Sequence, residues 1–163
     1  MHLTRLMARR AAAVAAIAIA TALAGGTPAQ ASDASLRKAV VEQERKLDAV
    51  QGAFDKATRD TVSAVGREQA QTALSKLRTA VRRQKAAVTK QRATSAKLKR
   101  ARTQYLAAVT SFLAGLGTFG QGLEVFDPDA PAKAKALIAK AKTQLESAAL
   151  RRERLRKLIV ARS

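Results

Sequence analysis

The 163-residue sequence contains no cysteine, no asparagine and no tryptophan, and it has only one tyrosine and one histidine. Without cysteine the chain can form no disulfide framework, thiolate site or lipid-bearing cysteine. Its single histidine is His2, so the rest of the chain cannot build the usual zinc sites or a Ser-His-Asp arrangement. We therefore predict no metal site and no cofactor.

The carboxylates and the lone tyrosine also argue against an enzyme. Glu42 and Glu44 are two residues apart and point to well separated sides of a helix, while Glu146 and Glu153 lie ~10 Å apart along one. Tyr105 falls on the apolar face of a predicted helix, where a core position is expected rather than a catalytic phenol. We predict a non-catalytic protein with no small-molecule substrate.

The N-terminal residues have the organisation of a secretory signal peptide. Three arginines among the first ten residues precede an apolar run, residues 11–24, and residues 29–31 fit a small-x-small cleavage site. The apolar run is shorter than the ~20 residues that a membrane-spanning helix needs. We expect residues 1–31 to be removed before Ser32, which leaves residues 32–163 as a single domain, secreted or in the cell envelope.

A seven-residue repeat runs through the middle of the chain. In four successive units, basic residues flank a central one: Lys76-Leu77-Arg78, Arg83-Gln84-Lys85, Lys90-Gln91-Arg92 and Lys97-Leu98-Lys99. A helix is the only regular structure that uses this spacing. The central residues then lie on one stripe, with a row of basic side chains along each edge, which is typical of a coiled-coil-like helix.

The fold class predicted from this pattern is all-α: an elongated antiparallel bundle of three long helices, at about residues 36–65, 67–116 and 131–160. Gly66 is expected to end the first helix in a left-handed conformation. Asp127 or Asp129, followed by Pro131, is a start signal for the last helix. The seam is polar around Thr94 and Ser95, so a break there would give four helices, although the unbroken period favours a continuous second helix.

Charge matching predicts how the first two helices pair. Folding the chain back near Gly66 places residues 42–44, Glu-Gln-Glu, opposite residues 90–92, Lys-Gln-Arg. Gln43 would then meet Gln91 within about one turn, in a buried polar layer that sets the register.

Residues 115–129 are predicted to be the one long connection, because they contain four of the eight glycines and a proline. The segment from Gly115 to Gly120 formally matches GxGxxG, but no strand or βαβ pattern surrounds it, so dinucleotide binding is not predicted. We interpret the segment as a helix end and a turn whose aromatic residues close the bundle. A small apolar contact site for a partner or a membrane is the alternative.

The formal net charge of +19 is unevenly distributed. No acidic residue occurs from Gln69 to Leu123, whereas eleven lysines and arginines do. A field of one sign attracts polyanions. The predicted polyanion-binding residues are Lys76, Arg78, Arg83, Lys85, Lys90, Arg92, Lys97, Lys99 and Arg100. The structural alternative is that these residues are the solvated flanks of a coiled coil.

Several partners fit such a surface. An anionic membrane surface or an acidic envelope polymer suits an exported protein. Nucleic acid is less favoured, because the helix lacks stacking aromatic residues and a groove-reading motif. The leading hypothesis is an exported binding protein, either a coiled-coil scaffold that self-associates or binds a helical protein, or an envelope-associated polyanion binder. A holdase-like chaperone that uses the basic-edged groove is the alternative.

Overall fold

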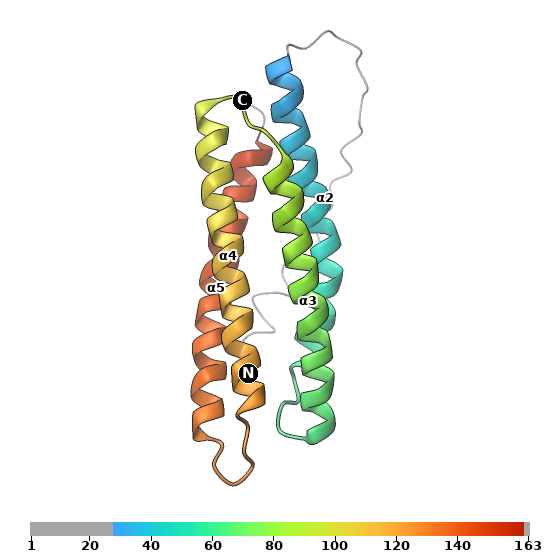
Figure 1. Cartoon of the computed structure of the whole chain (residues 1–163), viewed down its shortest axis with the longest axis vertical. Helices are drawn as coiled ribbons and strands as arrows, with labels where there is room; N and C mark the ends of the chain where they lie inside the picture. The colour runs from blue at the N-terminus through green and yellow to red at the C-terminus, as the bar shows by residue number, and fades with distance from the viewer. Residues whose placement is uncertain (1–27, 162–163) are drawn as a thin grey trace.

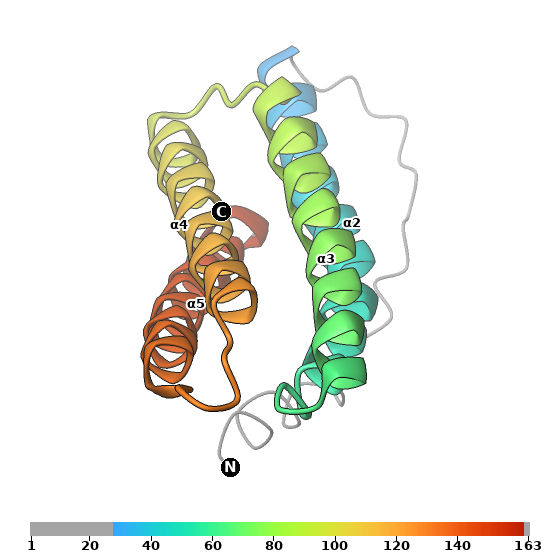
Figure 2. The ribbon, with the colours of Figure 1, turned by 60° about the horizontal axis from the view of Figure 1, so that its bottom comes forward.

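The computed structural model describes residues 28–161, which form four α-helices and no strand: α2 (Pro28–Ala57), α3 (Ala64–Lys90), α4 (Ala96–Glu124) and α5 (Ala132–Val160). Each helix runs antiparallel to the next, so that α2–α3 and α4–α5 form two hairpins (Figure 1). Figure 2 shows the hairpins side by side, with the α3–α4 connection at one end and the other two turns at the opposite end. The predicted all-α bundle is confirmed.

The seam of the seven-residue repeat forms the core of the bundle. Leu77, Val81 and Val88 of α3 are fully buried, as are Tyr105 and Val109 of α4. Burial of an aliphatic or aromatic side chain of this size contributes about 1.5–3 kcal/mol. The predicted apolar stripe is therefore the surface along which the helices pack.

Small residues allow α4 and α5 to pack closely. A Cβ atom at Gly122 would lie 2.7 Å from Ile138 Cγ1 and 3.4 Å from the Ala134 carbonyl oxygen, and one at Gly115 would lie 3.0 Å from Leu145. Alanines at seven-residue spacing supply the facing surface on α5, namely Ala134, Ala141 and Ala148, all of them buried. The small residues thus let α4 and α5 approach closely, with the Ile138 and Leu145 side chains packed directly on the glycines.

The prediction of one continuous second helix over residues 67–116 was wrong, and the structure shows the four-helix alternative. Helix α3 ends at Lys90, Gln91 is extended (φ −80°, ψ 140°), and α4 begins after Ser95, whose hydroxyl accepts a hydrogen bond from Leu98 N at 3.3 Å. The chain reverses there, so α4 packs beside α3 instead of extending it (Figure 1).

The predicted long connection was also misplaced. Residues 115–124 are the last turns of α4, so the GxGxxG match lies inside a helix. The connection is the shorter segment 125–131, and it is followed by α5 close to its predicted start. The N-cap position of α5 is Pro131 and no side chain caps it, so neither predicted aspartate does; Asp127 instead accepts a hydrogen bond from Asp129 N at 2.9 Å. The aromatic residues do pack at this end, where Phe54 and Phe119 make an edge-to-face contact at 5.3 Å.

Gly66 does not end the first helix. Helix α2 ends eight residues earlier than predicted, at Ala57, and Gly66 lies in the first turn of α3, with no positive φ at any described glycine. A Cβ atom at Gly66 would overlap the Asp60 carbonyl oxygen, so the close approach of the two backbones requires the glycine. The carboxylate of Asp60 accepts hydrogen bonds from Val62 N and Ser63 N, and hydrogen bonds from Ser63 hold the pKa of this carboxyl below its usual value.

The predicted register of the first hairpin was wrong by about one and a half turns. Glu44 of α2 pairs with Gln84 of α3, whereas charge matching placed Gln43 opposite Gln91. Gln91 lies at the end of α3, where its side chain donates to the Ala87 carbonyl oxygen at 3.4 Å. The register depends on where the turn lies, and the turn centres on residues 58–63 rather than on Gly66.

Candidate functional site: a basic corner and a buried polar cluster

The α3–α4 connection brings five of the nine predicted polyanion-binding residues together. Lys90 and Arg92 leave the end of α3, and Lys97, Lys99 and Arg100 occupy the first turns of α4. All five side chains are exposed, and within the described part of the chain none forms an ion pair with a carboxylate. We call these five residues the basic corner.

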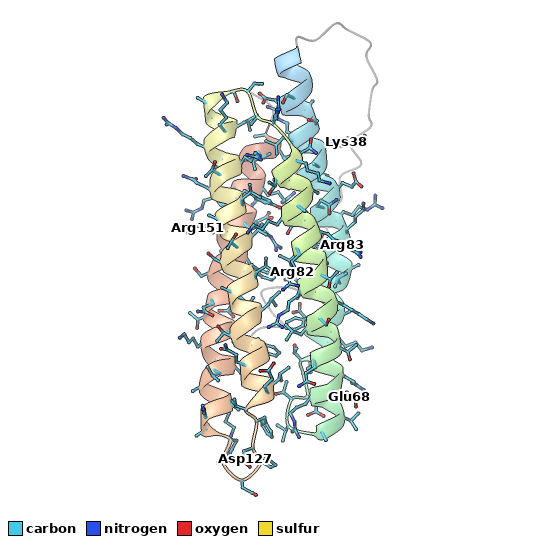
Figure 3. All side chains as sticks on the ribbon, in the orientation of Figure 1. Lys38, Glu68, Arg82, Arg83, Asp127 and Arg151 are labelled. Carbon is cyan, nitrogen blue, oxygen red and sulfur yellow. The ribbon has the colours of Figure 1, made fainter. Side chains whose placement is uncertain are left out.

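The other four predicted residues lie elsewhere. Lys76 and Arg83 line a shallow hollow of about 850 Å³ on the outer side of the α2–α3 hairpin, together with small residues such as Ala49, Ala53 and Ala80. Figure 3 shows Arg83 and Glu68 along this outer side of α3. The break at residues 91–95 therefore divides the predicted basic rows, so that they do not form one continuous surface.

Arg78 and Lys85 lie on the side of α3 that meets α4. The Arg78 guanidinium donates from Nη2 to the Leu116 carbonyl oxygen at 3.0 Å, and a Cβ atom at Gly120 would come within 2.7 Å of the same nitrogen. Half-buried Arg78 is thus engaged in joining α3 to α4, away from the basic corner. Half-buried Lys85 lines a second hollow together with Leu113, on the side of α3 toward which Arg82 points (Figure 3).

Hydrogen bonds from the start of α2 and from Arg102 of α4 hold the corner in place. Asp33 Oδ1 accepts from Thr94 N at 2.8 Å, and Ser32 Oγ donates to the Arg92 carbonyl oxygen at 2.8 Å. The bond from the Thr94 amide is the main cause that lowers the pKa of the Asp33 carboxyl. Arg102 donates to the carbonyl oxygens of Val88, at 3.3 Å, and Thr89, at 2.5 Å, which lie in the last turn of α3. Cations at this end of a helix satisfy its free carbonyl groups.

Positive charge is concentrated at the end of the bundle that carries the corner. We divide the bundle at the level of one residue from each helix, namely Glu44, Gln84, Tyr105 and Arg152. The part toward the corner comprises residues 32–43, 85–104 and 153–161, and it contains twelve basic and three acidic residues. Residues 45–83 and 106–151, about twice as many, contain fourteen basic and eight acidic residues. The net charge is +9 for the smaller part and +6 for the larger part, so the charge density is about three times higher at the corner end.

A buried polar cluster, which sequence reasoning missed, connects all four helices. Glu44 of α2 accepts at Oε1 from Gln84 Nε2 of α3 at 3.0 Å and from the Tyr105 hydroxyl of α4 at 2.5 Å, and the same oxygen forms an ion pair with Arg152 Nε of α5 at 3.2 Å. Gln84 also donates to the Tyr105 oxygen at 2.9 Å. The four residues are at most 8% exposed. Gln84 and Tyr105 on the seam were signals, but the partners from α2 and α5 could not be assigned without the register.

The electrostatics of the cluster favour a neutral tyrosine and a paired guanidinium. Burial, and then the neighbouring Glu44 carboxylate, raise the pKa of Tyr105 far above its usual value. The Arg152 guanidinium lies 5.0 Å from the centre of the Phe112 ring, a cation–π contact that compensates part of its desolvation. Gln84 Oε1 and Arg152 Nη1 are buried without a hydrogen-bond partner among residues 28–161. A constellation of this kind specifies how four helices fit together, because each partner comes from a different helix.

Among the described residues, no group of three or more His, Asp or Glu side chains is placed to hold a metal ion. By length and composition, α4 is the one described helix that could cross a membrane. Half of its most apolar stretch is buried inside the bundle, however, and core helices of soluble proteins can be equally long and apolar. Residues 28–31 begin α2, and residues 1–27 of the predicted signal peptide lie outside the described residues, so its cleavage stays a prediction.

The chain matches no protein-family model, no curated protein and no solved structure.

Proposed function

We propose that the protein is an exported, non-catalytic binding protein whose basic corner binds polyanions at the cell envelope. The observation that carries this proposal is the meeting of five exposed lysines and arginines where α3 turns into α4, with no carboxylate paired to them among the described residues. Unpaired cations at one end of a rigid bundle keep their full charge available for an external partner. The chemistry recognised is a dense array of phosphate or carboxylate groups, in a lipid surface or in a polymer.

The size of the site sets the expected affinity. Each lysine or arginine near an anionic membrane contributes about 1 kcal/mol, so five residues contribute about 5 kcal/mol and a partition constant of about 10³–10⁴ M⁻¹. On a dense linear polyanion, five contacts give a log-log salt slope of about −4. The proposal thus predicts weak, reversible and strongly salt-dependent binding.

Vesicle binding by the mature chain, residues 32–163, tests the proposal. Vesicles that contain phosphatidylglycerol should bind it at low salt, neutral phosphatidylcholine vesicles should not, and soluble polyphosphate should compete. Replacing Lys90, Arg92, Lys97, Lys99 and Arg100 with glutamine should reduce binding by at least 100-fold. Glutamine is nearly as good a helix former as lysine, so helicity should not change.

A matched control separates the corner from net charge. Five exposed basic residues that lie toward the other end of the bundle can be replaced with the same loss of charge: Lys56, Arg59, Lys133, Lys135 and Lys140. We expect this control variant to lose less than about 5-fold, in keeping with non-specific attraction. Equal losses in the two variants, or equal binding to neutral and anionic vesicles, would remove the corner as a site.

A second candidate is a module that binds a helical protein, and the hollow on the α2–α3 hairpin favours it. Small side chains line that hollow, and close packing of helices requires such residues. The holdase alternative is less well supported, because the apolar seam it would offer to clients is buried between the helices.

A further inference from the structure

The α3–α4 connection breaks a stretch of sequence that contains no helix breaker. From Arg67 to Ala114 the chain has neither glycine nor proline, and the seven-residue period continues across residues 91–95. Alanine, glutamine and arginine in this connection are good helix formers, and threonine and serine cost only a few tenths of a kcal/mol each. The backbone of the connection is therefore compatible with a helix as well as with a turn.

The interactions that hold the turn lie at one end of the bundle. They include the Ser95 cap, the bonds from Arg102 to the last turn of α3, and the hydrogen bonds that Ser32 and Asp33 make with Arg92 and Thr94. An exposed hydrogen bond contributes about 0.5–1.5 kcal/mol net. A helical connection would replace these bonds with its own backbone hydrogen bonds, so the two conformations of this segment are close in free energy.

The two hairpins are separable units that fit one another. Glycine and alanine contacts join α4 to α5, and the Glu44–Gln84 hydrogen bond joins α2 to α3. Across the interface between the hairpins, Tyr105 and Arg152 of one unit complete the polar cluster of the other. The α2–α3 surface is thus built to receive an α4–α5 hairpin, whichever copy of the chain supplies it.

We infer that the protein forms a domain-swapped dimer in which residues 91–95 become helical and the α4–α5 hairpin of each copy packs on the α2–α3 hairpin of the other. Helices α3 and α4 then form one helix of residues 64–124, ~90 Å long. Each half of the dimer contains one polar cluster, with Glu44 and Gln84 from one copy and Tyr105 and Arg152 from its partner. Exchange is a low-cost route to dimers, because every contact of the monomer outside the connection is formed again.

The charge of the basic corner gives the exchange a definite salt dependence. In the swapped dimer the connections of both copies meet at the two-fold axis, so the two corners face each other with ten basic residues in all. Their repulsion opposes the dimer at low ionic strength and is screened as the Debye length falls from ~30 Å at 0.01 M salt to ~8 Å at 0.15 M. Added salt should therefore favour the dimer, without any polyanion present.

The first measurement is the molar mass of the mature chain after refolding from urea over a range of protein concentrations, at about 0.02 M and about 0.5 M NaCl. We expect the dimer fraction to rise with protein concentration and to be several-fold higher at the higher salt. A monomer under all conditions, or a dimer that dissociates as salt is added, overturns the inference.

The second measurement distinguishes exchange from a side-by-side dimer. Gln71, near the start of α3, and Gln121, near the end of α4, are exposed and lie toward the same end of the monomer, because the two helices are antiparallel and Arg78 bonds to Leu116. Two neighbouring helices place them about two helix diameters, ~25 Å, apart at most. In one swapped chain they lie 50 residues apart on a single helix, ~75 Å. A chain with Gln71→Cys and Gln121→Cys, labelled with a donor and an acceptor and mixed with excess unlabelled chain, should lose energy transfer as the dimer forms. Unchanged transfer in the dimer refutes exchange.

Two variants act on the connection in opposite directions. Ala93→Pro blocks a helix through residues 91–95 and should abolish the dimer, since Ala93 N makes no hydrogen bond in the turn. The double variant Thr94→Ala, Ser95→Ala removes the cap of α4 and favours the helix, so it should raise the dimer fraction several-fold. The inference fails if Ala93→Pro, shown to be folded by circular dichroism, dimerises as the parent does, or if the double variant dimerises less.

Discussion

The polar cluster supports a sharp prediction about stability. Glu44 Oε1 accepts hydrogen bonds from Gln84 and Tyr105 and forms an ion pair with Arg152. Arg152 is only 6% exposed. Glu44→Leu leaves the guanidinium buried without its counter-ion. Removal of one partner of a buried ion pair costs about 3–5 kcal/mol. Domains of this size have a free energy of unfolding of about 5–15 kcal/mol, so this variant should be marginal.

The reciprocal change should cost less. Arg152→Met removes the cation but leaves the Glu44 carboxylate with two hydrogen bonds, from Tyr105 and Gln84, so we expect a loss of about 2–3 kcal/mol. The double variant Glu44→Leu, Arg152→Met removes both charges and keeps the bond from Gln84 to Tyr105. It should be within about 2 kcal/mol of the parent, because apolar residues of similar volume can replace a buried ion pair with little loss.

Urea unfolding followed by circular dichroism measures the three free energies and hence the coupling between the two sites. We expect a coupling energy of at least about 3 kcal/mol, at the upper end for residues in contact. Additive effects of the two single variants, or a Glu44→Leu protein within 1 kcal/mol of the parent, would show that the cluster does not hold the four helices as described.

Two further predictions concern the loss of stability at high pH and the effect of glycine-to-alanine substitutions on stability. The pKa of Tyr105, the only tyrosine, is raised in the folded protein, so its contribution to the free energy of unfolding is complete below the unfolded pKa of about 10 and falls by about 1.4 kcal/mol per pH unit above it. Tyrosinate absorbance should therefore appear together with unfolding. Tyr105→Phe should remove this pH-dependent loss of stability. Gly52→Ala and Gly117→Ala, where an added Cβ meets nothing within 4 Å, should each stabilise the protein by about 0.5–1 kcal/mol in urea unfolding, whereas Gly122→Ala should not, because its Cβ would meet Ile138. A stabilised Gly122→Ala protein would contradict the close packing of α4 on α5.

The sequence predicted what depends on local period, and it failed where tertiary packing decides. The helical class, the buried seam through Leu77 and Tyr105 and the start of the last helix followed from spacing and from proline signals. The glycines of α4 were taken for a connection because glycine usually interrupts helices. In the structure Gly115 and Gly122 allow α5 to approach, and that role depends on residues of another helix, which lie 12 to 30 positions away.

Of the nine predicted binding residues, five meet at the basic corner and four do not. The cause is the turn at residues 91–95, which sequence analysis did not favour. The rows of basic residues are continuous only on a continuous helix. Once α4 folds back, Lys76 and Arg83 remain on the outer side of α3, and Arg78 bonds to the α4 backbone. The corner could have been found from the four-helix alternative, because Lys90, Arg92 and Lys97 flank Thr94 and Ser95 directly.

Burial decides that the chain turns at residues 91–95. A helical connection is not forbidden, and the preference of five such residues for helix or turn amounts to at most a few kcal/mol. When the chain turns back, four side chains of α4 are buried between the α2–α3 hairpin and α5: Tyr105, Val109, Phe112 and Leu116. Burial of each contributes about 1.5–3 kcal/mol. An isolated chain gains that burial only by turning. A pair of chains gains the same burial with the connection helical, so protein concentration and salt, rather than local sequence, decide which partner supplies α4.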